Sequence, residues 1–346
     1  IQWQFIAVQA RAAQAFSRLD PDYAAYCAQA AARCWHGWAE GQPGAGEPAG
    51  FRAARQDTSP DALETVTLSW ACLAALEVSR MGAWDSAGGK AQHFAQELMR
   101  RQSQEYEHGQ REIRGFFYAD AERSLPLKDH CTSALPIVAL ARLLETCPEA
   151  DDAGQWRDAL RLYVEEYALP VSSRTPFGIV PYGLYVNPPV GSAQARPLAG
   201  GLSYRYFRWR EAPNAEEAAQ LKETLEHGGT SHLLCQAVGL ALTARVLEEP
   251  RARQLAYKQL EWVMGANPYA ACLMTGGGMN SPCPYSRAVG PIVGGIMNGF
   301  IGGEADEPFL DMKWVSAWNT TEYWLPHNGH YLWALAILEQ DQGLTV

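Results

Sequence analysis

Apolar residues recur at helical spacing along most of this chain, and this pattern constrains the fold more than any other feature. In residues 1–18 the apolar positions, from Trp3 to Phe16, fall on one helical face. The Asp20-Pro21-Asp22 run then supplies an N-cap and a first-turn proline for a second helix. The same spacing predicts further helices at about 59–81, 86–101, 130–147, 151–168, 229–247, 250–264 and 327–340. We therefore predict one all-α domain over residues 1–346, built from consecutive helical hairpins.

Long non-helical segments interrupt this pattern and are rich in glycine, proline and aromatic residues. They cover about 39–58, 169–212 and 265–326, and strand-like alternation is limited to short pieces near 114–118 and 177–186. Loops of this length inside a compact domain are usually functional. We expect them to form the working surface at one end of the helical scaffold.

The charge balance excludes some classes of partner. The chain has 28 Lys and Arg against 38 Asp and Glu, a formal net charge of -10. Such an acidic protein is not expected to bind nucleic acid or an anionic membrane as its main partner. No run of about 18 apolar residues is present, so no membrane-spanning helix is predicted. The chain begins at Ile1 without a signal-peptide cleavage pattern, which is typical of a mature product or a fragment.

The eight cysteines do not predict a metal site. No two of them form a Cys-x-x-Cys pair, and most lie inside apolar helical stretches. We predict buried free thiols and no zinc site. Free thiols leave a cytoplasmic location open.

Carboxylates and tryptophans gather between residues 302 and 328. Carbohydrate sites use this mixture, because aromatic faces pack on sugar rings while carboxyl groups bind hydroxyls and transfer protons. Glu322 is flanked by Tyr323 and Trp324, and an apolar setting keeps a carboxyl group protonated, as a general acid requires. Alternatively, Glu322 caps the last helix or pairs with Arg287.

The order of motifs along the C-terminal third resembles glycoside hydrolase family nine. A helix ends in Gly-Ala-Asn-Pro at 265–268, Pro-Tyr-Ser-Arg follows at 284–287, and Gly302-Gly303 precedes an acidic loop. Glu322 is then followed six residues later by Asn328. Residues 1–38 resemble the helical hairpin of the family that carries Asp-Pro-x-Tyr.

The resemblance implies an (α/α)6 barrel that hydrolyses a β-linked glycan by inversion, as endoglucanases and exo-acting glucosaminidases of the family do. It implies that Glu322 is the general acid and Asn328 its paired asparagine. It further implies an oligo- or polysaccharide substrate, no cofactor beyond a structural calcium ion, and a secreted or periplasmic location. The expected substrate-binding residues are Arg287, Trp318, Tyr323, Trp324, His327 and Asn328.

Three departures from the family pattern affect the prediction. The family's Pro-His-His-Arg keeps only its arginine here, Arg287, and Pro326 and His327 stand where the family has Asp-Tyr. The family's Asp-Ala-Gly-Asp, which carries the base, is not found in this sequence, although an inverting hydrolase needs two carboxyl groups roughly 6.5–9.5 Å apart. We therefore expect a barrel incomplete at its N-terminus, lacking its first helices and any preceding immunoglobulin-like module. As a substitute base, Asp129 or His130 would serve.

An incomplete barrel has a physical consequence. It would expose an apolar seam, so we expect the chain alone to be marginally stable or to self-associate.

The middle loops leave several alternatives open. Tyr182 either stacks on a sugar ring or fills the loop core. The arginines at 205, 208 and 210 alternate with aromatic residues, and they favour an acidic sugar if they face the cleft, or form a surface strip if they do not. The spacing of His227 and His232 does not suit a metal site.

Two other functions fit the same residues. A helical-toroid polysaccharide lyase acting on a uronate polymer would use Tyr182, His130 and the arginines at 205–210. A catalytically inactive relative would bind glycans only.

Overall fold

The computed structural model describes residues 1–39, 64–82, 85–186, 196–197, 201–208, 227–285, 290–303, 305–312 and 317–340. Helices dominate these residues, as the periodicity predicted. The α-helices are α1 (Gln2–Phe16), α2 (Pro21–Cys34), α3 (Thr65–Ser79), α4 (Asp85–Arg100), α5 (Leu135–Thr146), α6 (Ala153–Tyr163), α7 (Leu169–Ser172), α9 (Thr230–Leu247), α10 (Pro250–Val263), α11 (Trp318–Thr321) and α12 (Leu325–Gln340). Two π-helical turns, Trp35–Ala39 and Val164–Ala168, extend α2 and α6.

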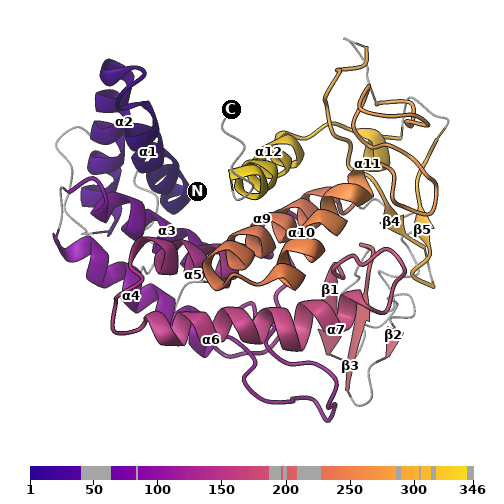
Figure 1. The fold of residues 1–346 in the computed structure, drawn as a ribbon, viewed down its shortest axis with the longest axis horizontal. Coiled ribbons are helices and arrows are strands. Elements are labelled where there is room, and N and C mark those ends of the chain that lie inside the picture. The colour runs from indigo at the N-terminus through magenta and orange to yellow at the C-terminus, as the bar shows by residue number, and fades with distance from the viewer. Residues whose placement is uncertain are drawn as a thin grey trace, which may run out of the picture.

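The helices pack as hairpins, with α1 on α2, α3 on α4, α5 on α6 and α9 on α10. The first helix of each hairpin also contacts the first helix of the next, which gives the series α1, α3, α5, α9 and α12. Figure 1 shows this series as an open arc, with α2, α4 and α6 along its outside. The predicted architecture of consecutive helical hairpins is therefore confirmed.

The middle helices of the series form the core. In α9, 15 of the 18 residues are buried, because neighbouring helices cover it on several sides. A Cβ atom on Gly239 would lie 2.5 Å from Cδ1 of Ile137, so the glycine allows α5 and α9 to approach closely. Helices at the two ends of the series, α1 and α12, bury only part of their residues.

Two helix starts test the local sequence signals. At α2 the Asp20 side chain accepts a hydrogen bond from the Tyr23 amide at 3.0 Å, as predicted. The helix predicted at 130–147 starts later than expected, at Leu135. Oδ1 of Asp129 accepts from the amides of Cys131 and Thr132, and this holds residues 129–132 in a separate turn. The start predicted at residue 59 lies outside the described residues.

Short strands lie among the long loops. Strands β1 (Gly183–Val186), β2 (Arg196–Pro197) and β3 (Leu202–Arg205) form an antiparallel sheet in the order β1-β3-β2. Strands β4 (Ile301–Gly302) and β5 (Pro308–Phe309) form a second one. Figure 1 shows both sheets and α11 on the right of the molecule, at the same end of the arc. The described parts of the loops predicted at 169–212 and 265–326 thus share one end of the scaffold, as expected, whereas the loop predicted at 39–58 lies outside the described residues except for its first residue. Near 114–118 there are only isolated bridges.

Two further predictions concern membrane-spanning helices and the state of the cysteines. Within the described part of the chain, no helix has the length and hydropathy needed to span a membrane. All eight cysteines lie in described segments as free thiols, and four of them, Cys27, Cys72, Cys235 and Cys272, are buried.

A cavity of about 470 Å³ opens between α1 and α12, bordered also by α3, α5 and α9. Apolar side chains are exposed on both helices: Val8 of α1, which lines the cavity, is 51% exposed, and Leu332 of α12, next in sequence to Trp333, is 64% exposed. Trp333 lines the cavity itself and is still 37% exposed. The lining also includes the charged side chains of Arg11, Glu77, Arg142 and Arg245. We propose that the apolar part of this surface is the seam predicted from the sequence.

We expect the 346-residue chain alone to self-associate through this seam. Replacing Val8 and Leu332 together by lysine should shift the chain toward monomer, because charges at the edges of an apolar contact oppose its burial. Light scattering coupled to size-exclusion chromatography measures the effect. The matched control is Leu19→Lys, an 81% exposed position in the turn between α1 and α2. Cooperative unfolding of the unmodified chain as a monomer would contradict the expectation.

Candidate active site

Glu322 lies at the end of α11, in a segment that hydrogen bonds tie to several loops. Its backbone leaves the helix in an extended conformation, with φ -73° and ψ 143°. The Glu322 carbonyl accepts a hydrogen bond from the Asn298 amide at 2.9 Å, and the Thr321 carbonyl accepts one from the Tyr285 amide at 3.0 Å. Since Asn298 is fully buried, the Glu322 backbone is anchored to the protein interior.

The Glu322 side chain is held by its neighbour two residues on. The indole N–H of Trp324 donates to Oε2 of Glu322 at 2.7 Å. Both side chains are half-buried, so the carboxyl group lies at the surface of the site with one oxygen fixed by the tryptophan.

Aromatic and imidazole rings surround this pair. The Trp324 ring centroid is 4.4 Å from that of His227, 5.2 Å from that of His130, and 6.0 Å from that of His327, which is nearly parallel to it. Trp318 packs on His227 at 4.9 Å. We call these five side chains the aromatic cluster. Its members come from the turn before α5, the segment before α9, and α11 and α12.

His227 is the member that sequence reasoning missed, because its spacing from His232 suggested only a poor metal site. Its neighbour Gly228 shows why it lies here. A Cβ atom at Gly228 would come 2.3 Å from the Asn298 carbonyl oxygen, and the Gly228 amide donates to the Asn319 carbonyl at 2.8 Å. The Gly228-Gly229 pair was the one signal in the sequence for this close approach.

The histidines of the site are kept neutral. Burial, followed by the charge of Arg208, lowers the pKa of His130 to about 3. Burial also lowers the pKa of His327 to about 4, and lowers that of His227, where Arg208 adds to the effect and Glu322 opposes it. Within the described residues, neither ring nitrogen of His130 has a hydrogen-bond partner. At neutral pH these rings therefore carry no charge.

The two residues predicted as substitute bases lie next to each other at the site, in different settings. Oδ1 of Asp129 accepts hydrogen bonds from two amides of its own turn and from the Thr132 hydroxyl. His130 points its ring at Trp324. Asp129 therefore shapes the turn that presents His130 to the cluster.

Other predicted site residues mainly hold loops in place. The Tyr323 hydroxyl lies 2.6 Å from the Thr275 hydroxyl. Asn328 accepts from the Ile296 amide at 3.1 Å and donates to the Gly294 carbonyl at 2.7 Å.

Two more predicted residues are buried. His327 is fully buried, and its Nδ1 lies 3.1 Å from the Ile296 carbonyl. Tyr182 packs its ring 5.5 Å from that of His232. Arg287 lies outside the described residues. Among the residues the structure does describe, no cluster of three or more potential ligand side chains could hold a metal ion.

A buried ion pair joins the end of β3 to the acidic loop. The side chains of Arg205 and Asp306 are 1% and 0% exposed, and Nε of Arg205 is 3.7 Å from Oδ1 of Asp306. The Asp306 carboxylate also accepts hydrogen bonds from the amides of Tyr206 at 3.0 Å and Phe207 at 3.1 Å. We call this arrangement the Asp306 clamp. It fixes the backbone immediately before Arg208.

Replacing Asp306 by asparagine should destabilise the protein by about 3 kcal/mol, because it removes the negative charge that lies beside the buried Arg205 guanidinium. The asparagine keeps the shape and tolerates the positive φ of 61° at this position. Urea unfolding measures the loss of stability. In the exposed pair of Asp158 with Arg161, Asp158→Asn should cost less than about 0.5 kcal/mol. A loss of less than about 0.5 kcal/mol for Asp306→Asn, as small as that of the exposed control, would contradict this role of the clamp.

Comparison with protein families gave a match over nearly the whole chain. The family model described as glycosyl hydrolase family 9 matches residues 2–335. Comparison with curated protein sequences found no match.

Solved structures match at the level of the fold. A single mutant of a thermostable endoglucanase from Alicyclobacillus acidocaldarius shares 16% identity over 98% of this chain and 55% of its own, with a TM-score of 0.56. The GH family 9 endoglucanase J30 shares 17% identity over 97% of this chain and 53% of its own, with a TM-score of 0.58. The cellulase Cel9M of C. cellulolyticum in complex with cellobiose shares 15% identity over 96% of this chain and 62% of its own, with a TM-score of 0.53.

The chain thus spans between 53% and 62% of the length of these structures. The matches confirm the predicted all-α fold of the (α/α)6-barrel type.

Proposed function

Because this chain belongs to glycosyl hydrolase family 9, we propose that it carries the general acid with which a glycoside hydrolase cleaves a β-linked glycan. The observation that carries the proposal is the position of Glu322. Its carboxyl group is held by the Trp324 indole at the edge of the aromatic cluster, where sugar rings can pack against aromatic faces.

We propose that Glu322 protonates the glycosidic oxygen as the bond to the anomeric carbon breaks. Because Oε2 accepts the indole hydrogen bond, Oε1 carries the transferred proton. Water attacks the anomeric carbon from the opposite face of the ring and loses a proton to a base, so the anomeric configuration inverts. Trp324 is then a positioning residue, and Trp318 and His227 extend the surface on which the sugar packs.

We propose Asp129 as the base that accepts the proton of the attacking water. Asparagine at position 129 keeps an oxygen for the turn and removes only the charge and the proton acceptor. His130 is a weaker proposal, because an imidazole with a pKa of about 3 is a poor proton acceptor near neutral pH. We propose that His130 instead supports the Trp324 ring, against which it packs edge-on.

The test is product analysis with the natural full-length polypeptide on a panel of neutral and acidic β-glycans. Hydrolysis by inversion releases reducing ends that are initially α-anomers by proton NMR. A polysaccharide lyase would instead leave a conjugated double bond that absorbs in the ultraviolet, and an inactive relative would bind oligosaccharides without turnover. Either of the last two results would overturn the proposal.

A further inference from the structure

Asn298 joins several segments of the candidate site. Its side chain is fully buried. Its backbone amide donates to the Glu322 carbonyl at 2.9 Å, and its carbonyl accepts from the Thr230 amide at 3.1 Å, at the start of α9. Its side-chain amide donates to the Trp318 carbonyl at 2.9 Å. One asparagine therefore connects the segment of the proposed general acid and α11 to the start of α9.

The side-chain amide of Asn298 also reaches His227. Its Nδ2 lies 3.4 Å from Nδ1 of His227, a hydrogen bond longer than the usual range. Because the Trp318 carbonyl can only accept, the Asn298 atom that faces both groups is the amide nitrogen, a donor. Burial lowers the pKa of His227, so the ring is neutral at pH 7. A neutral imidazole that accepts at Nδ1 carries its proton on Nε2.

The Nε2 atom of His227 is available to a ligand. Within the described part of the chain it has no hydrogen-bond partner, and His227 is only half-buried. Both ring nitrogens of His130 are sealed from solvent, but neither of those of His227 is found among such atoms. The His227 ring packs against Trp324 at 4.4 Å and Trp318 at 4.9 Å. An N–H donor therefore lies beside the rings on which we propose that the sugar packs.

We propose that Asn298 fixes His227 in the tautomer with its proton on Nε2, and that this N–H donates a hydrogen bond to a hydroxyl group of the glycan. His227 is then a substrate-binding residue, and Asn298 is a positioning residue that acts through it. This inference rests on the proposed hydrolase function. A hydroxyl oxygen accepts a hydrogen bond from a neutral N–H. A donor whose ring is already oriented loses less entropy on binding than a mobile one.

Nitrogen NMR at pH 7 tests the tautomer, with the natural full-length polypeptide isotope-labelled at histidine. The signals of His227, assigned by their loss in His227→Phe, should show a protonated Nε2 and an unprotonated Nδ1. Asn298→Ala should allow the other tautomer to appear as well, because Nδ1 loses its donor. A wild-type spectrum with the proton on Nδ1 would overturn the inference.

Substrates that each lack one hydroxyl group test the contact with the glycan. Phenylalanine at position 227 keeps an aromatic ring beside Trp324 but has no N–H. On a β-linked glucose tetrasaccharide, His227→Phe should raise KM by about 3- to 10-fold, the effect of one neutral hydrogen bond. One monodeoxy form of the tetrasaccharide should show the same rise with wild-type protein and no further rise with His227→Phe. His227→Gln keeps an N–H donor and should recover part of the loss.

Asn298→Ala should abolish the contribution of the same hydroxyl, and adding His227→Phe to it should raise KM no further. The matched control is Asn267→Ala. Asn267 is also buried, and its side-chain amide donates to the Trp262 carbonyl at 2.8 Å, but at the end of α10. This control should lower stability without changing the tautomer of His227 or KM. If Asn298→Ala fails to fold, judged by its thermal midpoint, the wild-type spectrum and His227→Phe carry the test.

The outcomes also separate this inference from the function on which it rests. If the tetrasaccharide is hydrolysed but no single hydroxyl is coupled to His227, the inference is wrong and the hydrolase stands. A coupled hydroxyl whose contribution survives Asn298→Ala would overturn the role of Asn298. Where another β-glycan is hydrolysed instead, its deoxy forms replace those of the tetrasaccharide. No hydrolysis of any β-glycan would overturn both the inference and the proposed function.

Discussion

Glu322→Gln is expected to reduce hydrolysis of a β-linked oligosaccharide by about 10³-fold or more, because general acid catalysis contributes on that order. Glutamine keeps an oxygen for the Trp324 indole hydrogen bond and has almost the same shape. It cannot supply a proton to the leaving oxygen. The loss should therefore fall on kcat, with little change in folding, and steady-state kinetics on the natural full-length polypeptide measures it.

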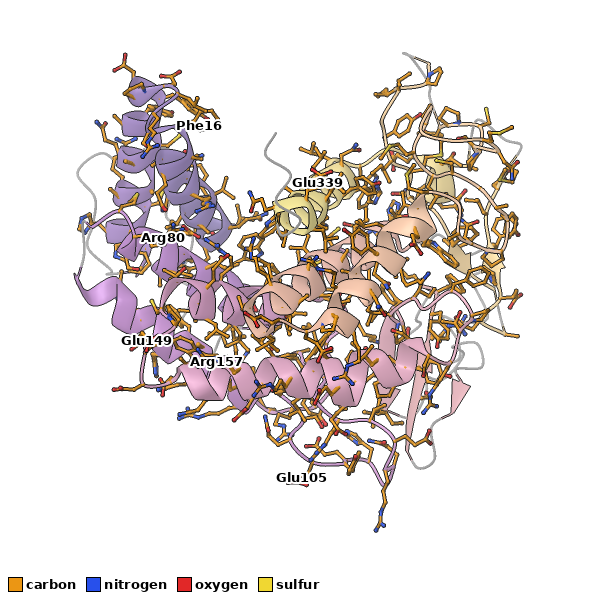
Figure 2. All side chains as sticks on the ribbon, in the orientation of Figure 1. Phe16, Arg80, Glu105, Glu149, Arg157 and Glu339 are labelled. Atoms are coloured by element: carbon orange, nitrogen blue, oxygen red, sulfur yellow. The ribbon has the colours of Figure 1, made fainter. Side chains whose placement is uncertain are left out.

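The leaving group provides a sharper test of the role of Glu322. An aryl glycoside with an acidic phenol needs little protonation, so Glu322→Gln should lose much less activity on that substrate than on an oligosaccharide. The matched control is Glu339→Gln, near the other end of α12, which Figure 2 labels well away from the α11 loop. Wild-type turnover of the oligosaccharide by Glu322→Gln would exclude Glu322 as the acid.

Trp324→Phe separates the positioning role from the catalytic one. Phenylalanine keeps an aromatic face beside His227 but has no N–H for Oε2 of Glu322. Its effect on kcat should be smaller than that of Glu322→Gln, since the acid is still present.

Most of the helices could be predicted from the sequence, because apolar spacing and helix caps involve residues that are close together in the chain. The Asp20 cap and the Pro21 start of α2 are examples. The start of α5 was predicted too early, because the side chain of Asp129 can cap either a helix or a separate turn, and the sequence pattern alone does not distinguish the two. The order of the hairpins along the arc also followed, since short connections make consecutive helices neighbours.

Only part of the candidate site could be predicted from the sequence, because some of its residues are close together in the chain and others are not. Glu322, Trp324 and His327 lie within one short segment, so one motif showed all three. His227 and Asn298 reach the same place through contacts between segments far apart in the sequence. The close approach of the Gly228 backbone to Asn298 brings these segments together, and apolar periodicity does not encode it.

Buried neutral histidines should make the fold sensitive to acid. Burial lowers the pKa of His232, His327 and His330 to about 4, from an ordinary value of 6.5. Above pH 6.5 the imidazoles are neutral in both the folded and the unfolded chain, so they contribute no pH dependence. Between pH 6.5 and about 4 the unfolded chain binds protons that the folded chain does not. Stability therefore falls as the pH is lowered through this window.

The expected size of the effect is large. At pH 5 each of the three histidines costs about 2 kcal/mol of stability, so the free energy of unfolding should fall by about 6 kcal/mol between pH 7 and pH 5. His130, with a pKa of about 3, adds to the loss in the same direction. A total stability of about 5–15 kcal/mol is typical of proteins, so this chain should unfold at mildly acidic pH. Urea unfolding at a series of pH values between 7 and 5 measures the slope directly.

A single substitution tests whether the buried histidines cause this slope. His330→Gln replaces one buried imidazole of α12 by a side chain of similar size that does not titrate. The slope of the unfolding free energy against pH should fall by about 1.4 kcal/mol per pH unit, the value for one proton. His93→Gln, at an exposed position of α4, controls for the removal of a histidine as such. The midpoint of urea unfolding at pH 7 shows whether His330→Gln also alters packing. A packing loss lowers the unfolding free energy equally at every pH, so it does not change the slope of that free energy against pH. An unchanged slope in His330→Gln would mean that this imidazole is protonated as readily in the folded chain as in the unfolded one, so its burial could not be the source of the acid sensitivity.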